Sequence, residues 1–263
     1  MSDSVHWLIQ RNQADTTDVR RVAEALEADG IPVHLVDLER GGALPPLPDL
    51  PNNVPVVCHG PAFIPRALKH PRLRPWVFFD LDTFRWSRFR AAWKEAMLSR
   101  DASVVDLAAA QTLLRARGQQ FVRPDEDSKA FDGGVYTATE LDNAVGKRVS
   151  QATPVVVASP VNVEVEWRFV VVGGEIVACS EYKRWGRAST DGSVPRGAIR
   201  MAEEIASLWG PASVYCLDLA DTGDRLGVVE ANCFNAARLY GCAVRRVVQA
   251  VNDHVLKQAA GCG

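Results

Sequence analysis

Residues 213–234 read SVYCLDLADTGDRLGVVEANCF, and this stretch decides the fold. Two largely apolar runs, Ser213–Ala220 and Leu226–Cys233, flank the polar turn Asp221–Arg225, which contains a glycine. Apolar runs joined by a short glycine-containing turn predict a β-hairpin. The polar residues inside these two strands are therefore interpreted as positions on a sheet.

Three of those polar residues are Asp218, Glu230 and Asn232. Side chains alternate between the two faces of a strand, so Glu230 and Asn232 share one face. A simple antiparallel pairing brings Asp218 to the same face, unless a bulge in the turn breaks the alternation. Carboxylate and amide oxygens are ligands that suit Mg²⁺. We therefore expect a magnesium site here; the alternative is a solvated sheet face with scattered polar groups.

A second hairpin precedes the first in the chain. The strands Val161–Val172 and Glu175–Tyr182 flank Gly173-Gly174, a pair that tolerates the positive φ of a tight turn. Alternation along the first strand predicts a polar face made by Glu164, Glu166 and Arg168. This face either orients an anion beside a carboxylate or is a solvated ion pair that contributes little.

A polar loop with a glycine pair follows the strand Gln120–Arg123. The loop contains Lys129 and Gly133-Gly134. Glycine-rich loops bring backbone N–H groups close to phosphates, and lysine or arginine neutralises the phosphate charge. The loop has neither the Walker A pattern nor a G-x-G-x-x-G pattern, so it predicts a phosphate contact of another kind.

The first third of the chain alternates strand and helix. This pattern predicts a βαβ unit with a parallel sheet. The expected strands are Val5–Ile9, Ile31–Leu38, Val54–Cys58 and Trp76–Asp80, and the expected helix is Thr17–Asp29. Further on, helices are expected at Phe84–Ser99 and Asp106–Arg117, from the capping box Thr137–Glu140 to about Val149, and through Val244, Val248, Val251 and Val255, whose spacing predicts a core face. A strand is expected at Pro154–Ala158.

In chain order, these elements and motifs resemble the ATP-grasp superfamily, in particular its small carboxylate–amine ligases, over roughly residues 120–240. The resemblance implies an ATP-grasp fold of mixed α/β and α+β type, with ATP between two α+β subdomains. The units expected are a small βαβ N-terminal domain at residues 1–85, a central subdomain at 86–152 and a C-terminal subdomain at 153–263 that carries the metal site.

The resemblance also implies roles for individual residues. Asp218, Glu230 and Asn232 match the magnesium ligands of the family. Arg168 and Lys129 match catalytic residues that contact the phosphates of ATP, and Arg123 stands where the family has a phosphate-binding lysine. The backbone of Val156, Val157 and Ala158 is expected to meet the adenine, and Glu164 or Glu166 to lie near the ribose or a metal. No lysine in Thr153–Val157 matches the second lysine of the family.

Three residues are candidates for binding the substrate. Lys183 lies in a basic, aromatic segment after the first hairpin strands, and Arg238 lies just beyond Asn232. Each of these cations is alternatively a solvated surface residue. His59 ends a predicted parallel strand, and ligands bind beyond the carboxyl ends of such strands.

The composition limits the classes of function. The 263 residues are 47% hydrophobic and 24% charged, which excludes a disordered or fibrous protein. The formal net charge of −2 argues against bulk attraction to nucleic acid or to an anionic membrane. No apolar run approaches the roughly 20 residues of a membrane span, and no secretory signal is visible, so we expect a cytoplasmic protein with unpaired cysteines.

The activity expected from these observations is ATP-dependent ligation of a carboxylate to an amine. The small-molecule acid is activated as an acyl-phosphate, and ADP and phosphate are released. The cofactors expected are ATP and Mg²⁺. The alternatives are a kinase with the same fold and a nucleotide-binding module without catalysis; the sequence does not specify the oligomeric state.

Overall fold

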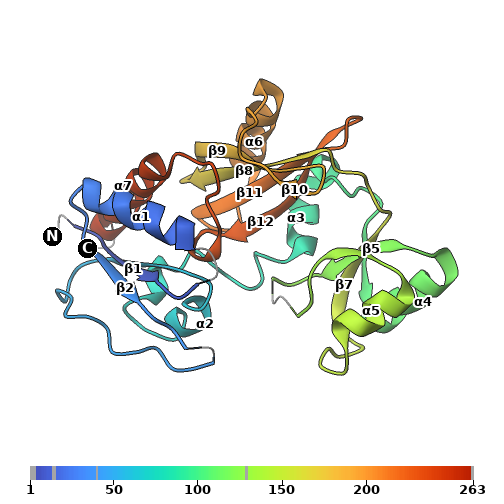
Figure 1. The fold of residues 1–263 in the computed structure, drawn as a ribbon, viewed down its shortest axis with the longest axis horizontal. Helices are drawn as coiled ribbons and strands as arrows, with labels where there is room; N and C mark the ends of the chain where they lie inside the picture. Colours follow the sequence, from blue (N-terminus) through green and yellow to red (C-terminus); the bar gives the residue numbers. More distant parts are fainter. Residues whose placement is uncertain (1–3, 14–15, 40, 128–129, 262–263) are drawn as a thin grey trace.

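The structure is a computed structural model that describes residues 4–13, 16–39, 41–127 and 130–261. Its described strands form three sheets, of three, four and five strands. Figure 1 shows the three-stranded sheet and the four-stranded sheet at opposite ends of the molecule, with the five-stranded sheet between them. The chain has the mixed helix and antiparallel-sheet architecture of the ATP-grasp fold that the sequence predicts.

The N-terminal sheet is parallel, in the order β2-β1-β3. Its strands are β1 (His6–Gln10), β2 (Val33–Val36) and β3 (Val56–His59), and α1 (Thr16–Ala28) connects the first two. The predicted βαβ unit is therefore confirmed. The short helix α2 (Ile64–Ala67) follows β3.

The predicted strand Trp76–Asp80 is wrong. The 3-10 turn η1 (Arg74–Trp76) occupies its start, and the residues after it are not part of a sheet. The backbone N–H of Phe78 instead donates to the side-chain oxygen of Asn235 at 2.7 Å. Val77 and Phe78 are buried, so the apolar pattern here reports contact with the core and not strand pairing.

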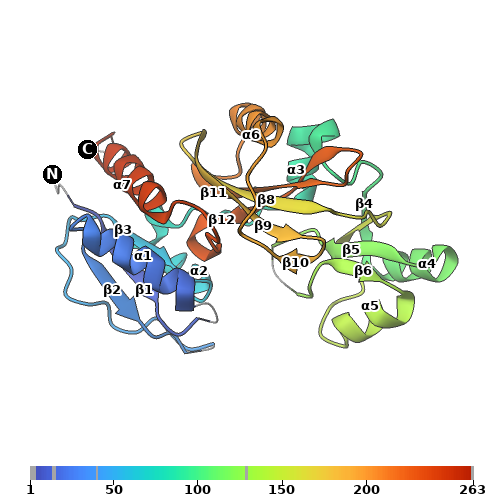
Figure 2. The same cartoon turned by 45° about the horizontal axis from the view of Figure 1, so that its top comes forward.

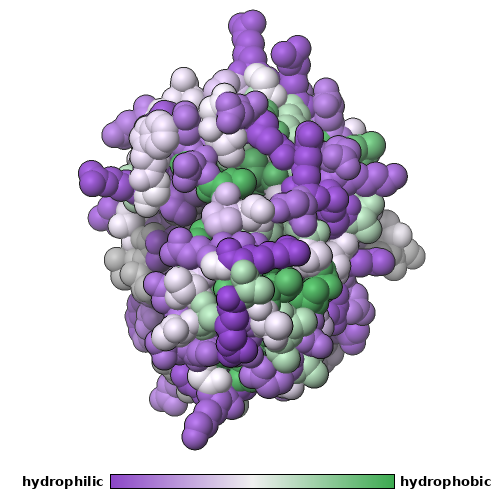
Figure 3. All heavy atoms as spheres, turned by 90° about the vertical axis from the view of Figure 1, so that its right-hand side faces the viewer, coloured by the Kyte–Doolittle hydropathy of each residue, from purple (hydrophilic) through white to green (hydrophobic). Residues whose placement is uncertain are grey.

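The four-stranded sheet is antiparallel, in the order β4-β7-β5-β6. The strands are β4 (Ser103–Asp106), β5 (Gln120–Pro124), β6 (Gly134–Tyr136) and β7 (Pro154–Ala158), and α4 (Leu107–Arg117) and α5 (Ala138–Val145) pack against them. Asp106 caps α4, and Thr137 and Glu140 form the predicted capping box of α5. Figure 3 shows the end of the molecule that α4 and α5 cover; hydrophilic side chains predominate there, with smaller hydrophobic patches between them.

The five-stranded sheet is antiparallel, in the order β10-β9-β8-β11-β12. Its strands are β8 (Val165–Val172), β9 (Glu175–Arg184), β10 (Arg187–Ala188), β11 (Val214–Asp221) and β12 (Leu226–Cys233). Both predicted hairpins are confirmed, and Gly173 and Gly174 have φ values of 60° and 87° in the first turn. The helices α3 (Trp86–Trp93) and α6 (Arg196–Leu208) cover one face, where Trp167, Phe169 and Leu217 are buried.

These packing relationships move two of the predicted domain boundaries. Because β7 pairs with β4 and β5, the sheet of the central unit extends to residue 158, beyond the boundary expected after residue 152. Because α3 packs in the core of the five-stranded sheet, residues 86–93 belong with that sheet and not with the four-stranded one. Both differences come from contacts between segments far apart in the sequence.

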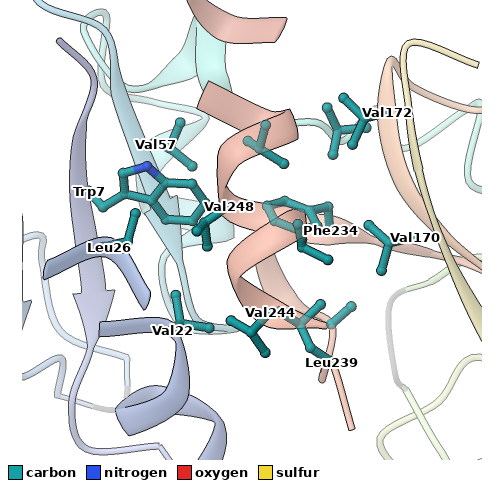
Figure 4. Packing of buried hydrophobic residues seen from close by; sticks show 14 of the residues in the cluster. Trp7, Val22, Leu26, Val57, Val170, Val172, Phe234, Leu239, Val244 and Val248 are labelled. Carbon is teal, nitrogen blue, oxygen red and sulfur yellow. The ribbon is translucent and has the colours of Figure 1, made fainter. Parts of the chain in front are cut away.

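The C-terminal helix α7 (Val244–Gly261) lies beside α1 in both ribbon views (Figures 1 and 2). Its predicted core stripe is buried and packs with Trp7, Leu26 and Phe234 in one cluster (Figure 4). The indole N–H of Trp7 donates to Asn252 at 2.8 Å. The last helix therefore fastens the N-terminal sheet to the five-stranded sheet. Among the described residues, no helix has the length and apolar character of a membrane span.

Candidate active site between two sheets

The polar group predicted on the second hairpin is assembled on one sheet face. Asp218 lies directly opposite Glu230, and Asn232 is the next residue along on the same face of β12. The amide nitrogen of Asn232 donates to Asp218 at 3.0 Å and to Glu230 at 3.2 Å. The bulge in this hairpin falls after Asp218, on the turn side, so it does not disturb the alternation that brings the three side chains together.

Arg168 lies next to this group on β8, opposite Asp218 in the register. Its guanidinium forms a bidentate pair with Asp218, with N–O distances of 2.8 and 2.7 Å. The side chains are only 7% and 1% exposed, so solvent screens this pair little. Burial raises the pKa of the Asp218 carboxyl, and Arg168 opposes that shift. Burial disfavours the charged guanidinium as well, but Asp218 holds the pKa of Arg168 well above its usual value.

Two tyrosines flank the guanidinium of Arg168. Its central carbon lies 5.4 Å from the ring centroid of Tyr182 and 5.0 Å from that of Tyr240. The two rings stack at 4.9 Å with an angle of 16° between their planes. Cation–π contact of this kind stabilises a guanidinium whose water has been removed. Arg168 is therefore held both at its edge, by Asp218, and at its sides, by the aromatic rings.

Glu230 has an arginine partner of its own from a different sheet. Arg123 lies on β5 of the four-stranded sheet, and its Nη1 donates to Glu230 at 2.5 Å. Burial acts to raise the pKa of Glu230, but Arg123 and Asn232 reverse this and hold it below its ordinary value. Glu230 is thus ionised at neutral pH, and the ion pair joins the two sheets.

A cavity of about 1030 Å³ lies between the four-stranded and five-stranded sheets. Asp218, Glu230 and Asn232 line it together with Arg123 and Arg168. The volume is at the upper end of the range usual for small-molecule sites, which leaves room for more than one ligand. Glu166, Lys183 and Arg238 also line the cavity.

Glu166 binds two neighbours at the edge of this cavity. Lys183 Nζ lies 2.9 Å from one of its carboxylate oxygens, and the hydroxyl of Tyr182 donates to the other at 2.5 Å. Glu164 is placed differently, because it is not among the residues that line the cavity. Its backbone instead pairs with Asp221 and Trp185 beside the hairpin turns. Of the two glutamates that the sequence predicted near a ligand, the structure brings only Glu166 to the cavity.

The segment expected to meet the adenine is misplaced in the sequence prediction. Val156, Val157 and Ala158 are buried in β7, the strand between β4 and β5, and do not line the cavity. The chain reaches the cavity only after β7 ends, where Val161, Asn162 and Val163 form part of its wall. The apolar run marked the strand correctly, but an inner strand uses its backbone groups for sheet pairing.

His59 is a second misplaced prediction. Its side chain is 3% exposed and packs against Phe234, with ring centroids 5.7 Å apart, outside the lining of the cavity. Burial without a nearby anion lowers its pKa to about 4. Pro61 and Gln13, in the loops after β3 and β1, line the cavity instead. The ends of the parallel strands thus reach the cavity, as expected, through other residues.

Lys129 lies outside the described residues. Around it, Asp127, Phe131 and Gly133 of the loop between β5 and β6 line the cavity. A Cβ added to Gly133 would lie 3.1 Å from the Cβ of Arg123, so a side chain there would press on that arginine. The glycine keeps the loop close to Arg123.

Sequence analysis missed Tyr182 and Tyr240 as residues of this site. Tyr182 adjoins the predicted Lys183, and Tyr240 follows the predicted Arg238 by two positions. Only the fold brings the two rings together on either side of Arg168. A spacing of two from Ser180 to Tyr182 would have marked one shared strand face, but it could not have paired Tyr182 with Tyr240.

The side chains present fit a magnesium ion in their chemistry. Asp218 and Glu230 offer carboxylate oxygens and Asn232 an amide oxygen, the donor types that a hard cation takes. The described residues contain no cluster of three or more His, Cys, Asp or Glu that could hold a metal, so this mixed set with one amide is the candidate. Two arginines beside the carboxylates add the positive charge that a polyphosphate requires.

Comparison with protein families supports this geometry. The sequence matches a family that is described as an ATP-grasp domain, the second family of its clade, over residues 97–250. This chain is an ATP-grasp protein. The matched segment contains the four-stranded and five-stranded sheets and all five of the residues Arg123, Arg168, Asp218, Glu230 and Asn232.

Solved ATP-grasp structures share the fold across nearly the whole chain. A RimK domain protein from Sphaerobacter thermophilus is 17% identical with a TM-score of 0.63, covering 96% of this chain and 100% of that one. The D-alanine–D-alanine ligase of Bacillus anthracis is 7% identical with a TM-score of 0.62, over 99% and 100%. The ATP-grasp ligase PsnB, complexed with a precursor variant, Mg and ADP, is 14% identical with a TM-score of 0.55, over 98% of each chain.

Comparison with the sequences of curated proteins found no match. The similarity to the three solved structures therefore describes the fold of this ATP-grasp protein. Its substrates have to be inferred from its own residues.

Proposed function

We propose that this ATP-grasp protein is an ATP-dependent carboxylate–amine ligase that works through an acyl-phosphate and releases ADP and phosphate. One observation carries the proposal. Two arginines from different sheets, Arg123 and Arg168, meet the Asp218, Glu230 and Asn232 set in one cavity. A triphosphate with a divalent cation is the ligand whose charges match two guanidinium groups beside two carboxylates.

In this proposal the protein contributes positioning and charge neutralisation. Asp218, Glu230 and Asn232 hold the magnesium ion, which when bound neutralises phosphate charge. Arg123 holds phosphate oxygens from the side of the four-stranded sheet, and Arg168 holds the transferred γ-phosphate from the opposite side. Lys129 is proposed as a further phosphate contact from the glycine-containing loop. The backbone of residues 161–163 faces the adenine, and Glu166 faces the ribose.

The reaction has two steps. A carboxylate oxygen of the acid attacks the γ-phosphorus of ATP, ADP leaves, and an acyl-phosphate forms. The amine nitrogen then attacks the acyl carbon, loses a proton, and phosphate leaves. Arg168 and Arg238 lie together on the cavity wall, where they orient the carboxylate and its acyl-phosphate, and Lys183 assists from the edge. Water exclusion by the cavity protects the intermediate from hydrolysis.

The structural neighbours support this choice of chemistry. PsnB is an ATP-grasp ligase complexed with Mg and ADP, and the Bacillus anthracis neighbour is a D-alanine–D-alanine ligase. We infer that the substrates of the present chain are likewise small acids, amino acids or peptides. The end of the cavity at Gln13, Pro61 and Arg238 has room for such a substrate beyond the nucleotide site.

A test of the proposal is a search for acid- and amine-dependent ADP formation. The purified protein is incubated with MgATP and pools of amino acids, small acids and peptides, and products are identified by phosphorus NMR and mass spectrometry. The expected products are ADP, phosphate and an amide. Release of AMP and pyrophosphate would refute the acyl-phosphate route, and a phosphorylated product without dependence on amine would indicate a kinase.

Two variants separate this site from a contaminating activity. Glu230→Gln removes a proposed metal ligand and is expected to abolish the reaction. Glu175→Gln, at the exposed start of β9 on the same sheet, is expected to retain it. If both variants behave alike, the activity does not come from this cavity.

A further inference from the structure

The loop that connects η3 (Phe234–Ala236) to α7 contains an unusual backbone conformation. Tyr240 has a φ of 45°, in the left-handed region that favours glycine. A bulky aromatic residue persists there only when surrounding contacts determine it, and such residues cluster at functional sites. The contacts that hold this loop are therefore where a functional reason for the strain is to be sought.

Helix α1 of the N-terminal unit supplies those contacts. Asp18 accepts the backbone N–H of Leu239 at 2.6 Å. Arg21 donates to the carbonyl of Cys242 at 2.8 Å and to the carbonyl of Tyr240. The two α1 residues also pair with each other, 3.2 Å apart. Although more than two hundred residues separate them from the loop, they fix the backbone on both sides of Tyr240 and at its own carbonyl.

The same loop positions Arg168. The carbonyl of Arg238 accepts from Nη1 of Arg168 at 2.9 Å, and the ring of Tyr240 lies 5.0 Å from its guanidinium carbon. Asp218 occupies Nε and Nη2 of that guanidinium. The loop therefore controls the one nitrogen of Arg168 that Asp218 does not hold, together with one of its two aromatic neighbours.

We propose that Asp18 and Arg21 are positioning residues that act through the 238–242 loop to aim Arg168 at the transferred phosphate. The proposal rests on the proposed function, which places the γ-phosphate at Arg168. If α1 releases the loop, Tyr240 can leave its strained conformation, and the carbonyl of Arg238 and the aromatic ring move with it. Arg168 then keeps its pair with Asp218 but loses its orientation toward the ligand.

The inference predicts an effect on the γ-phosphate alone. The non-hydrolysable analogue AMPPNP contains that phosphate and ADP does not, so the ratio of their dissociation constants with Mg²⁺ isolates the contribution of Arg168. Calorimetry is expected to show that Arg21→Met weakens Mg-AMPPNP binding about tenfold, or about 1.4 kcal/mol, and leaves MgADP binding unchanged. Asp18→Asn is expected to act in the same direction.

The neighbouring residue Arg20 provides a matched control. Its side chain is 70% exposed and lies within 3.7 Å of Glu24 on the same helix. Arg20→Met removes an arginine from α1 without touching the loop, so it is expected to bind both nucleotides like the wild type. Arg21→Lys, which keeps a cation that can reach one carbonyl, is expected to restore part of the AMPPNP affinity.

Three outcomes would overturn the inference. One is a variant that lowers the melting temperature yet retains the wild-type ratio of AMPPNP to ADP affinity, since this identifies a purely structural role. Another is equal loss of both affinities. The third is a wild-type protein that does not distinguish the two nucleotides. If Arg21→Met does not fold, the same ratio is read from Arg21→Lys and Asp18→Asn. Failure of the ligase proposal is distinguishable, because it would remove product formation and leave the nucleotide ratio intact.

Discussion

The cavity contains two arginine–carboxylate pairs that differ in almost every physical respect. Arg168 and Asp218 lie on adjacent strands of one sheet, form two hydrogen bonds and are 7% and 1% exposed. Arg123 and Glu230 come from different sheets, form one hydrogen bond and are 14% and 26% exposed. The first pair is part of a sheet, whereas the second pair is a connection between sheets.

This difference indicates a division of labour within the site. The five-stranded sheet provides a fixed wall, because Asp218 and Arg168 hold each other and Tyr182 and Tyr240 hold the guanidinium. The four-stranded sheet provides an adjustable wall, because its contact with Glu230 is a single ion pair from Arg123. A ligand that replaces this ion pair can change the distance between the walls without disturbing the fixed one.

The largest expected effect comes from breaking the fixed pair. Asp218→Asn leaves the charge of Arg168 buried without its counter-ion, and removal of one partner from a buried pair costs about 3–5 kcal/mol. Urea unfolding is the measurement. Glu230→Gln, which breaks the connecting pair, is expected to change the free energy of unfolding by no more than about 1 kcal/mol. Equal effects of the two variants would show that the two walls do not differ.

A buried titratable group without a charged partner extends the comparison to the parallel sheet. The pKa of His59 falls from 6.5 to about 4 on burial, so between these values the unfolded chain binds a proton that the folded protein does not. Stability due to neutral His59 is therefore complete above the unfolded pKa and lost as the pH falls toward the folded one. Lowering the pH from about 7.5 to about 4 is expected to cost about 3 kcal/mol from this residue.

His59→Gln separates this contribution from that of the carboxylates. All other titrating groups remain in the variant, so the difference in unfolding free energy between wild type and variant isolates His59. We expect this difference to shift in favour of the variant by about 3 kcal/mol over that pH interval. A difference that does not change with pH would mean that His59 takes up protons in the folded protein.

Replacing each arginine by lysine sharpens the contrast at constant charge. Lysine cannot reproduce the bidentate fork or the stacking on two rings, so Arg168→Lys is expected to lower stability by about 2 kcal/mol. Arg123→Lys keeps its single contact in a more exposed setting and is expected to cost less than about 1 kcal/mol. Differential scanning calorimetry of the two variants measures both values, and the reverse order would contradict the account.

The smallest effect concerns the edge of the fixed wall. Trp185 has a φ of 49° in the turn between β9 and β10, is 62% exposed and lines the cavity. Asparagine tolerates this conformation better and little packing is lost, so Trp185→Asn is expected to stabilise the protein by up to about 1 kcal/mol. A decrease in the free energy of unfolding would show that the indole contributes packing that its exposure conceals.

The sequence predicted the fixed wall well because its geometry is local. Asp218, Glu230 and Asn232 share a face through strand alternation and one short turn, and Glu166 and Arg168 do so within a single strand. Local rules also located the capping box of α5 and the glycine turn of the first hairpin. Hydrogen bonding between neighbours in sequence determines all of these features.

Features that depend on distant segments were not accessible in the same way. The run Trp76–Asp80 is apolar because Asn235 and the core receive it, and not because it pairs as a strand. The backbone that reaches the cavity lies three residues beyond the predicted adenine segment, since β7 is an inner strand. The contact of Arg123 with Glu230, and the hold of α1 on the loop beside Arg168, each depend on how sheets and helices pack.

The most direct test of the central claim is a crystal structure with AMPPNP and magnesium. The account predicts the triphosphate between Arg123 and Arg168, with the metal ion on oxygens of Asp218, Glu230 and Asn232. It also predicts that Arg123 leaves Glu230 for phosphate while the Tyr182–Tyr240 stack stays in place. A nucleotide bound outside this cavity, or one whose phosphates contact neither arginine, would contradict it.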